Sequence, residues 1–233
     1  MPNLPRTPWD QAAAAHLLRR AAFGGRPEEA EGLAAAGLEG AVDRVLADNG
    51  RGLPSPPVTD PAEERRRREL RRALRSEEPA ARREFGAYNQ AMRETFDALR
   101  TWWLECMRAG GAGAREKLTL FWHGHFATSQ TKVRCNHLML GQNETFRRLG
   151  TGPFGALCTA MVRDPAMLVW LDGRQSHGKA PNENFAREML ELFTLGEGHY
   201  SEEDIREAAR CFTGWTVNPA NGRSVFAPRR HDQ

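Results

Sequence analysis

The stretch from residue 182 to residue 214 contains two successive amphipathic helix patterns, and it constrains the fold more than any other feature. In NENFAREMLELFTLGEG, Asn182 is a suitable N-cap, and the apolar residues that follow share one arc of a helix. In SEEDIREAARCFTG, Ser201 and Asp204 form a capping box ahead of apolar residues spaced i, i+3, i+4 and i+7. Each pattern has an apolar side that must be buried, so the pair predicts helices packed against helices.

Helix patterns recur along the rest of the 233-residue chain, whereas strand patterns hardly occur. We therefore expect an all-α fold, a multi-helix bundle-like domain with long loops and little or no β-structure. Within its charged helical part, Pro79 and Gly86 are expected to divide the chain into separate helices. Four segments are expected to pack as one domain: an N-terminal helical segment (1–50), a Pro/Gly linker (51–60), a long charged helical segment (61–110) and a helical core that carries the His/Glu motifs (111–233).

Composition and charge exclude several classes of function. The formal net charge is only +3, and the basic run RRRREL at residues 65–70 lacks interleaved aromatic residues, so nucleic acid is not an expected partner. The four cysteines form no C-x-x-C pair, which is typical of small buried hydrophobic residues. The chain as written contains no apolar run of ~18 residues and no leader pattern, so we expect a cytoplasmic protein without a membrane span.

The segment FWHGHFATS, residues 121–129, holds two histidines around one glycine. If a helix continues through it, His123 and His125 project roughly 160° apart. If the chain becomes extended at Trp122, both rings fall on one side, as in metal-binding H-x-H pairs. Gly124 disfavours continuation of the helix. A further alternative is that one histidine caps the helix end while the other binds a buried carbonyl group.

The polar arc of the helix after Asn182 is the second candidate for chemistry. It contains Asn184, Arg187, Glu188 and Glu191, and the pattern fits either a solvated charged face or a face turned into a cleft. In a cleft, two carboxylates one turn apart could bind a metal or exchange protons. The short GEG turn should return His199 to the end of this helix. The loop at residues 172–182, DGRQSHGKAPN, is expected to be exposed, and its His177 could close over a site.

These residues support two hypotheses of function. The first is a hydrolase in which a histidine or carboxylate activates water while Arg187 or Asn184 holds an anionic or carbonyl oxygen. Its cofactor would be a divalent metal such as zinc. The predicted catalytic residues are His123, His125, Glu188, Glu191, Arg187 and Asn184, and the predicted metal ligands are His123, His125, Glu188 and His199. The second is a noncatalytic helical module that binds a partner protein, in which the same residues form a structural polar network.

Several blocks of the sequence also carry a resemblance to a known family. They occur in the order HLLRRAAFG, EKLTLFWHGHFATS, DPAMLVWLDG, NENFAREMLELFTLGEGHYSEEDIREAARCFTGW and RHD. In these blocks the chain resembles the bacterial family called domain of unknown function 1800, from about Thr7 to the C-terminus. The resemblance implies a mostly helical bacterial protein whose relatives are often exported, with no established catalytic residues.

Members of that family usually continue through a second portion of comparable length, whereas this chain ends at RHDQ. The resemblance therefore predicts a truncated or split form. Its expected partner is then either another protein or the missing C-terminal portion of the family domain.

Overall fold

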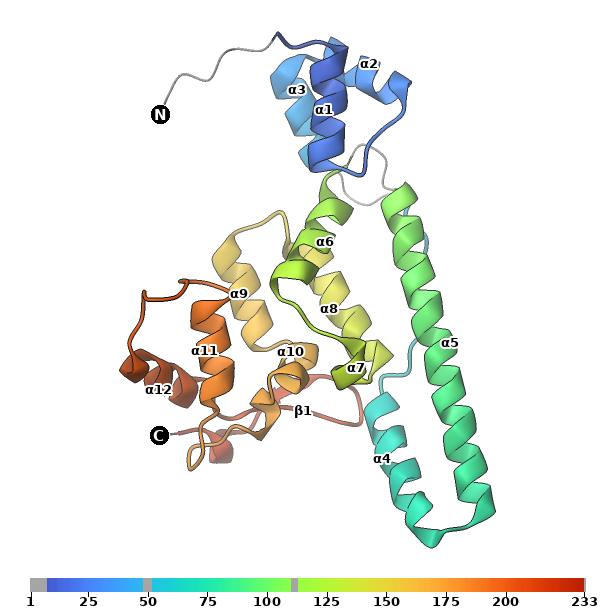
Figure 1. Cartoon of the computed structure of the whole chain (residues 1–233), viewed down its shortest axis with the longest axis vertical. Coiled ribbons are helices and arrows are strands. Elements are labelled where there is room, and N and C mark those ends of the chain that lie inside the picture. Colours follow the sequence, from blue (N-terminus) through green and yellow to red (C-terminus); the bar gives the residue numbers. More distant parts are fainter. Residues whose placement is uncertain (1–7, 48–51, 110–112, 233) are drawn as a thin grey trace. The chain divides into compact units, whose positions relative to one another are not determined.

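The computed structural model describes residues 8–47, 52–109 and 113–232 of the chain. Within these ranges the chain forms twelve α-helices and one small sheet of two strands, which confirms the mostly helical fold with little β-structure (Figure 1). The chain divides into two compact units, unit 1 (Met1–Pro56 and Arg100–Trp122) and unit 2 (Pro57–Leu99 and His123–Gln233). The predicted segment boundaries at 50–51 and 110–111 lie outside the described residues.

Unit 1 is built around three short helices, α1 (Gln11–Ala21), α2 (Pro27–Ala35) and α3 (Gly37–Leu46), which lie against one another in Figure 1. Asp10 caps the first of them by accepting a hydrogen bond from the backbone N–H of Ala13. Small and aliphatic side chains fill the space between the helices, so the helix axes can approach closely. The buried residues of this cluster are Ala14, Leu18, Ala30, Leu33, Ala41, Val45 and Ala114.

A single long helix, α5 (Pro79–Ala109), contributes to both units. It begins at Pro79, as the sequence predicted, but the expected division at Gly86 is wrong because the helix runs through that residue. One glycine costs a helix about 1 kcal/mol relative to alanine, which a helix of 31 residues readily tolerates. Its first part lies beside α4 (Glu63–Ala73), where the hydroxyl of Tyr88 donates to the carbonyl oxygen of Glu63 at 3.1 Å.

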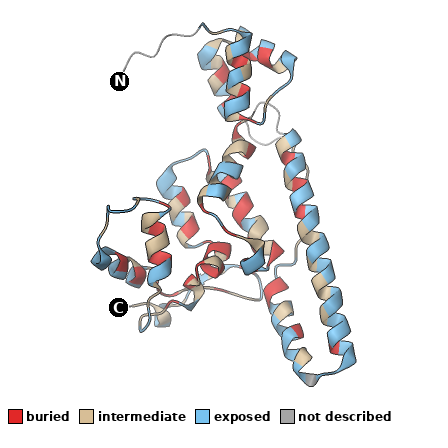
Figure 2. Ribbon diagram, in the orientation of Figure 1, coloured by how far each residue is buried: buried red, intermediate tan, exposed pale blue. Residues whose placement is uncertain are grey.

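The rest of unit 2 consists of short helices and a hairpin. Buried residues lie on the sides of these helices that face one another (Figure 2). The 3₁₀ helices include η2 (Gly173–Gln175) and η3 (Pro228–Arg230). The α-helices and strands are α6 (Arg115–His125, shared with unit 1), α7 (Gln130–Val133), α8 (Asn136–Leu149), α9 (Phe154–Val162), α10 (Pro165–Trp170), α11 (Glu183–Glu191), α12 (Glu202–Cys211), β1 (Trp215–Val217) and β2 (Ser224–Phe226).

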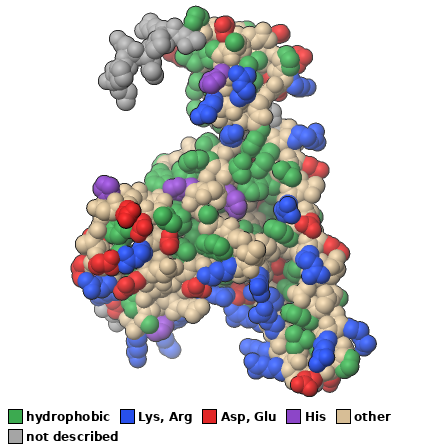
Figure 3. Space-filling model, viewed as in Figure 1, with side chains coloured by type: hydrophobic (Ala, Val, Ile, Leu, Met, Phe, Trp, Pro, Cys, Tyr) green, Lys and Arg blue, Asp and Glu red, His purple; other side chains and the backbone are tan. Residues whose placement is uncertain are grey.

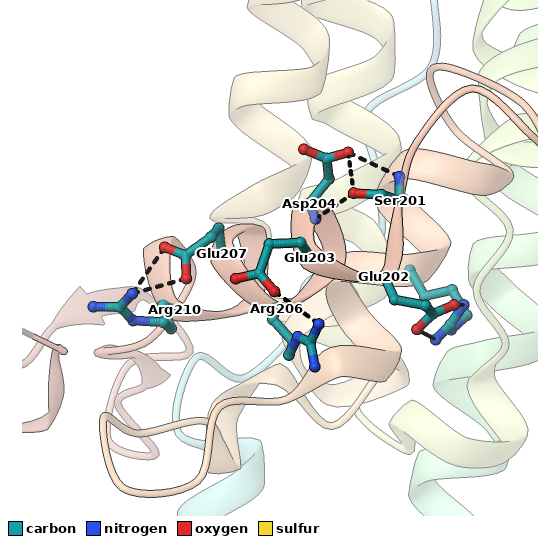
Figure 4. Close-up of polar contacts among 8 residues, drawn as sticks. Ser201, Glu202, Glu203, Asp204, Arg206, Glu207 and Arg210 are labelled. Carbon is teal, nitrogen blue, oxygen red and sulfur yellow. Dashed lines mark hydrogen bonds and ion pairs between the residues drawn. The ribbon is translucent and has the colours of Figure 1, made fainter.

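The two helices predicted from residues 182–214 form as expected. Asn182 caps α11 by accepting from the N–H of Phe185, and Ser201 and Asp204 form the capping box of α12 (Figure 4). The helices pack through their apolar sides, with the rings of Phe185 and Phe212 5.4 Å apart. Local capping and periodicity are sufficient to define both elements.

A chain of buried polar groups joins the middle of unit 2. The amide of Gln142 on α8 donates to the Oδ1 atom of Asp164 at 2.7 Å, and its carbonyl oxygen accepts from the hydroxyl of Thr128 at 2.5 Å. The same Asp164 oxygen accepts from the N–H of Met167 and so caps α10. Burial of this carboxyl group raises the pKa of Asp164 to about 7, against the smaller opposing effect of its hydrogen bonds.

The raised pKa of Asp164 predicts a specific dependence of stability on pH. Because the folded pKa lies above the unfolded value, the contribution of this group is fully present below about pH 4. It is lost as the pH rises through about 7. An Asp164→Asn variant keeps an Oδ1 acceptor and carries no charge. Its free energy of unfolding relative to the parent should therefore rise by at most a few kcal/mol between pH 4.5 and 7.5.

Urea unfolding at several pH values measures this difference directly. Asp172→Asn is the control, because Asp172 is half-exposed and paired with Lys132 at 2.8 Å. A difference between Asp164→Asn and the parent that stays constant with pH would contradict the assignment.

Candidate functional site

The two histidines of FWHGHFATS lie on a helix. Helix α6 continues through Gly124 to His125, so the helical alternative holds although a glycine disfavours it. The two rings therefore leave the helix in different directions. The ring of His123 lies 6.4 Å from that of Phe146, whereas the ring of His125 contacts a different group of aromatic residues.

His125 joins the end of α6 to the end of α11. Its Nε2 atom lies 3.0 Å from the carbonyl oxygen of Phe193, the second residue after α11. A carbonyl oxygen only accepts, so Nε2 carries the hydrogen and donates it. The rings of Phe126, Phe193 and Phe154 surround the imidazole at 4.8, 6.0 and 6.1 Å. This is the carbonyl contact that the nonmetal alternative describes for one of the histidines.

His123 lies in a less polar setting. Its side chain is half-buried, and removal from water lowers the pKa of the imidazole below its ordinary value. A lowered pKa favours the neutral ring near pH 7. Burial therefore disfavours the cationic form of His123.

The polar arc of α11 is tied mainly to the segment that leads into α12. The guanidinium of Arg187 donates to both carboxylate oxygens of Glu202 at 2.9 and 2.8 Å, a contact drawn in Figure 4 at the labelled Glu202. The hydroxyl of Tyr200 donates to the Oε2 atom of Glu191 at 2.5 Å. This hydrogen bond is the main reason that the pKa of Tyr200 rises to about 12.

The remaining candidates make no such contact. Asn184 and His199 are exposed and Glu188 is half-buried. Among the described residues, none of these three side chains has a hydrogen-bond or ion-pair partner. The backbone carbonyl of Glu188 accepts from the N–H groups of Leu192 and Phe193, which close the last turn of α11.

The predicted metal ligands do not come together. Over the part of the chain that the structure describes, no three histidine, cysteine or acidic side chains are grouped so that they could hold a metal ion. His125 reaches the backbone at the end of α11 through the carbonyl oxygen of Phe193. The assignment of zinc to His123, His125, Glu188 and His199 stays a prediction.

A second polar site lies elsewhere in unit 2. Residues 177–179 of the loop between α10 and α11 and residues 229–232 near the C-terminus line a pocket of about 530 Å³. From the sequence we expected only that His177 could close over a site. The signal that could have revealed the pocket is the density of basic residues in SHGK and PRRHD, because two short basic segments suggest a shared anion.

Comparison with known proteins gives one match, which is to a family model. No curated protein and no solved structure matches the chain. None of the helices that the structure describes combines the length and the apolar character needed to cross a membrane. The model of the family described as "Protein of unknown function (DUF1800)" matches residues 16–233. The chain therefore belongs to the DUF1800 family of proteins of unknown function.

Proposed function

We propose that this chain is a noncatalytic helical module that binds a partner protein, with the polar residues around α11 holding its helices in register. One observation carries the proposal. His125, Glu191 and Arg187 are each engaged by a different protein group, namely a carbonyl oxygen, a tyrosine hydroxyl and a carboxylate. Each of these polar groups is already used within the protein, and Arg187, Glu191 and Tyr200 interact with one another electrostatically.

Hydrolysis makes different demands on such residues. A general base and an oxyanion donor must both lie within hydrogen-bonding reach of one substrate. Here the charge of Arg187 is already paired with Glu202, and the Nε2–H group of His125 is already donated to Phe193. Each contact links two elements, α6 with the end of α11 or α11 with the start of α12. Links of this kind favour one packing of helices over its alternatives.

Exposed apolar side chains beside the His125 contact support the binding of a partner. Phe154 touches the His125 ring and is 42% exposed, while Leu192 and Leu195 on either side of Phe193 in the chain are 61% and 52% exposed. Large apolar side chains left in water at neighbouring positions mark contact surfaces. The partner would offer an apolar segment to this surface.

The arginines of α4 give weaker support for the binding of a partner protein than the exposed apolar side chains do. Arg65, Arg66 and Arg68 each lie within ion-pairing distance of a glutamate of the same unit, at 3.8, 2.6 and 2.6 Å. Paired charges offer little to an acidic partner, because a new partner must first replace the existing one.

The metal hypothesis gives the first test. Elemental analysis of the purified chain is expected to find no stoichiometric metal, and the His123→Ala and Glu188→Ala variants should match the parent in metal content. Circular dichroism checks that both variants keep their helices. Stoichiometric zinc in the parent, lost from both folded variants, would instead support the hydrolase.

The His125 contact gives a second test. His125→Phe keeps an aromatic ring but leaves the carbonyl of Phe193 without its donor, so the free energy of unfolding should fall by about 1–2 kcal/mol. His125→Gln can donate from its amide and should recover part of the loss. His199→Phe is the control at an exposed histidine. If His125→Phe and His199→Phe have the same free energy of unfolding in urea, the hydrogen bond of His125 does not stabilise the fold.

The apolar surface gives the third test. The double variant Leu192→Ser and Leu195→Ser should lose a protein that the immobilised parent retains from a bacterial extract, because a serine offers no apolar area to the partner. The exposed variant His199→Phe should retain the same protein in equal amount, as quantified by mass spectrometry. Retention by the serine variant at the parent's level would rule out this surface.

A further inference from the structure

The pocket between residues 177–179 and 229–232 is held open by backbone contacts. His177 and Ala180 exchange backbone hydrogen bonds and form a tight turn with Gly178 and Lys179 at its tip. The N–H of Gly178 donates to the carbonyl oxygen of Arg230 at 2.8 Å and so pins this turn to the C-terminal segment. A Cβ atom at Gly178 would lie 3.0 Å from the Cα atom of Asp232, so a larger residue fits only if the neighbouring backbone shifts by a few tenths of an ångström.

Hydrogen bonds to neighbouring segments hold both walls of the pocket, residues 177–179 and 229–232, in place. The guanidinium of Arg230 donates to the carbonyl oxygens of Arg174 and Ser176, at 2.9 and 3.4 Å. The hydroxyl of Thr213 accepts from the N–H of Asp232 at 2.8 Å. The backbone carbonyl oxygen of Thr213 lies 3.0 Å from the Nδ1 atom of His231. In Figure 1 the two segments run side by side below α11 and α12.

The pocket holds positive charge that the protein does not neutralise. Its lining includes Lys179, Arg229 and Arg230, and among the residues that the structure describes none of these three forms an ion pair. The single acidic group of the lining, Asp232, accepts from the guanidinium of Arg210, which also pairs with Glu207. Figure 3 shows blue side chains beside a histidine at the lower edge of unit 2, where these segments lie.

Lys179 and Arg229 line the same pocket without an ionic partner among the described residues, and like charges that share a site repel one another. An anion between the side chains removes this cost. We infer that the pocket binds a phosphate monoester dianion. A guanidinium pairs with phosphate through two parallel N–H bonds, and lysine supplies a point charge that suits the same group. Two imidazoles, from His177 and His231, add donors when protonated.

The size of the pocket agrees with this class of ligand. A volume of about 530 Å³ lies within the range of small-molecule sites and exceeds the space that a bare phosphate ion fills. The backbone N–H groups of His177 and Gly178 are already used within the protein, so the charged side chains are expected to carry most of the recognition. This inference is independent of whether the corner at His125 is catalytic, because the two sites share no residue.

Isothermal titration calorimetry on the full chain, at constant ionic strength, tests the inference. The probes are inorganic phosphate, phenyl phosphate and a phosphoserine peptide, and acetate is the monoanion control. The parent should bind the phosphate probes saturably, and the double variant Lys179→Gln and Arg229→Gln should bind them about tenfold or more weakly. Both side chains are exposed, so the variant should fold like the parent.

Two further variants separate a built site from general electrostatic attraction. Arg72→Gln on α4 removes one exposed charge from the same unit and should leave phosphate binding unchanged. Gly178→Ala keeps every charge but crowds the backbone of Asp232, so it should shift the two segments slightly and weaken binding. The probe that binds most tightly identifies the ligand as a small ester or a phosphorylated side chain. Absence of saturable phosphate binding, or equal weakening by Arg72→Gln, would overturn the inference.

Discussion

The buried carboxylate of Glu63 is the contact on which the packing of unit 2 most depends. Its two oxygens accept from the N–H groups of Asn136 and His137, at 2.9 and 3.2 Å, at the first turn of α8. The N-cap residue Cys135 gives that helix no side-chain cap, so a carboxylate from α4 takes its place. Burial raises the pKa of Glu63, and the N–H groups at the positive end of the helix oppose that rise. The side chain of Asn136 then reaches the Met92 carbonyl on α5, so α4, α5 and α8 meet at one point.

The neighbouring residue extends this arrangement to the basic pocket. Glu64 is buried and its Oε1 atom accepts from Arg68 and Arg174, at 2.6 and 2.8 Å. Arg174 lies in η2, and its carbonyl oxygen in turn accepts from Arg230. The carboxylate therefore neutralises Arg174 and leaves the charge of Arg230 without a carboxylate partner among the described residues. Two adjacent glutamates on α4 thus fix both the start of α8 and the loop that forms one wall of the pocket.

The sequence predicted the structural features that depend on residues close to one another in the chain. The caps at Asn182 and Ser201 and the scarcity of strands are local properties, and the structure has them. Continuation through Gly86 was not predicted, and continuation through Gly124 was only one of the alternatives, because packing outweighs the small cost of a glycine in a helix. The burial of Glu63 and Glu64 was not predicted either. Their segment EERRRREL has the composition of a solvated helix, and the partners that bury them lie 73 to 110 residues further along the chain.

The candidate site around α11 and the basic pocket differ in whether their polar side chains remain available to bind a ligand. Around α11 the sequence predicted residue types that suit catalysis, and in the folded chain His125, Glu191 and Arg187 are already bonded to protein groups. In the pocket, the side chains of Lys179 and Arg229 line a common space without ionic partners among the described residues. Residue type and spacing cannot distinguish these outcomes, because both depend on which distant groups meet. A ligand is therefore best sought where the fold concentrates charge without compensating it.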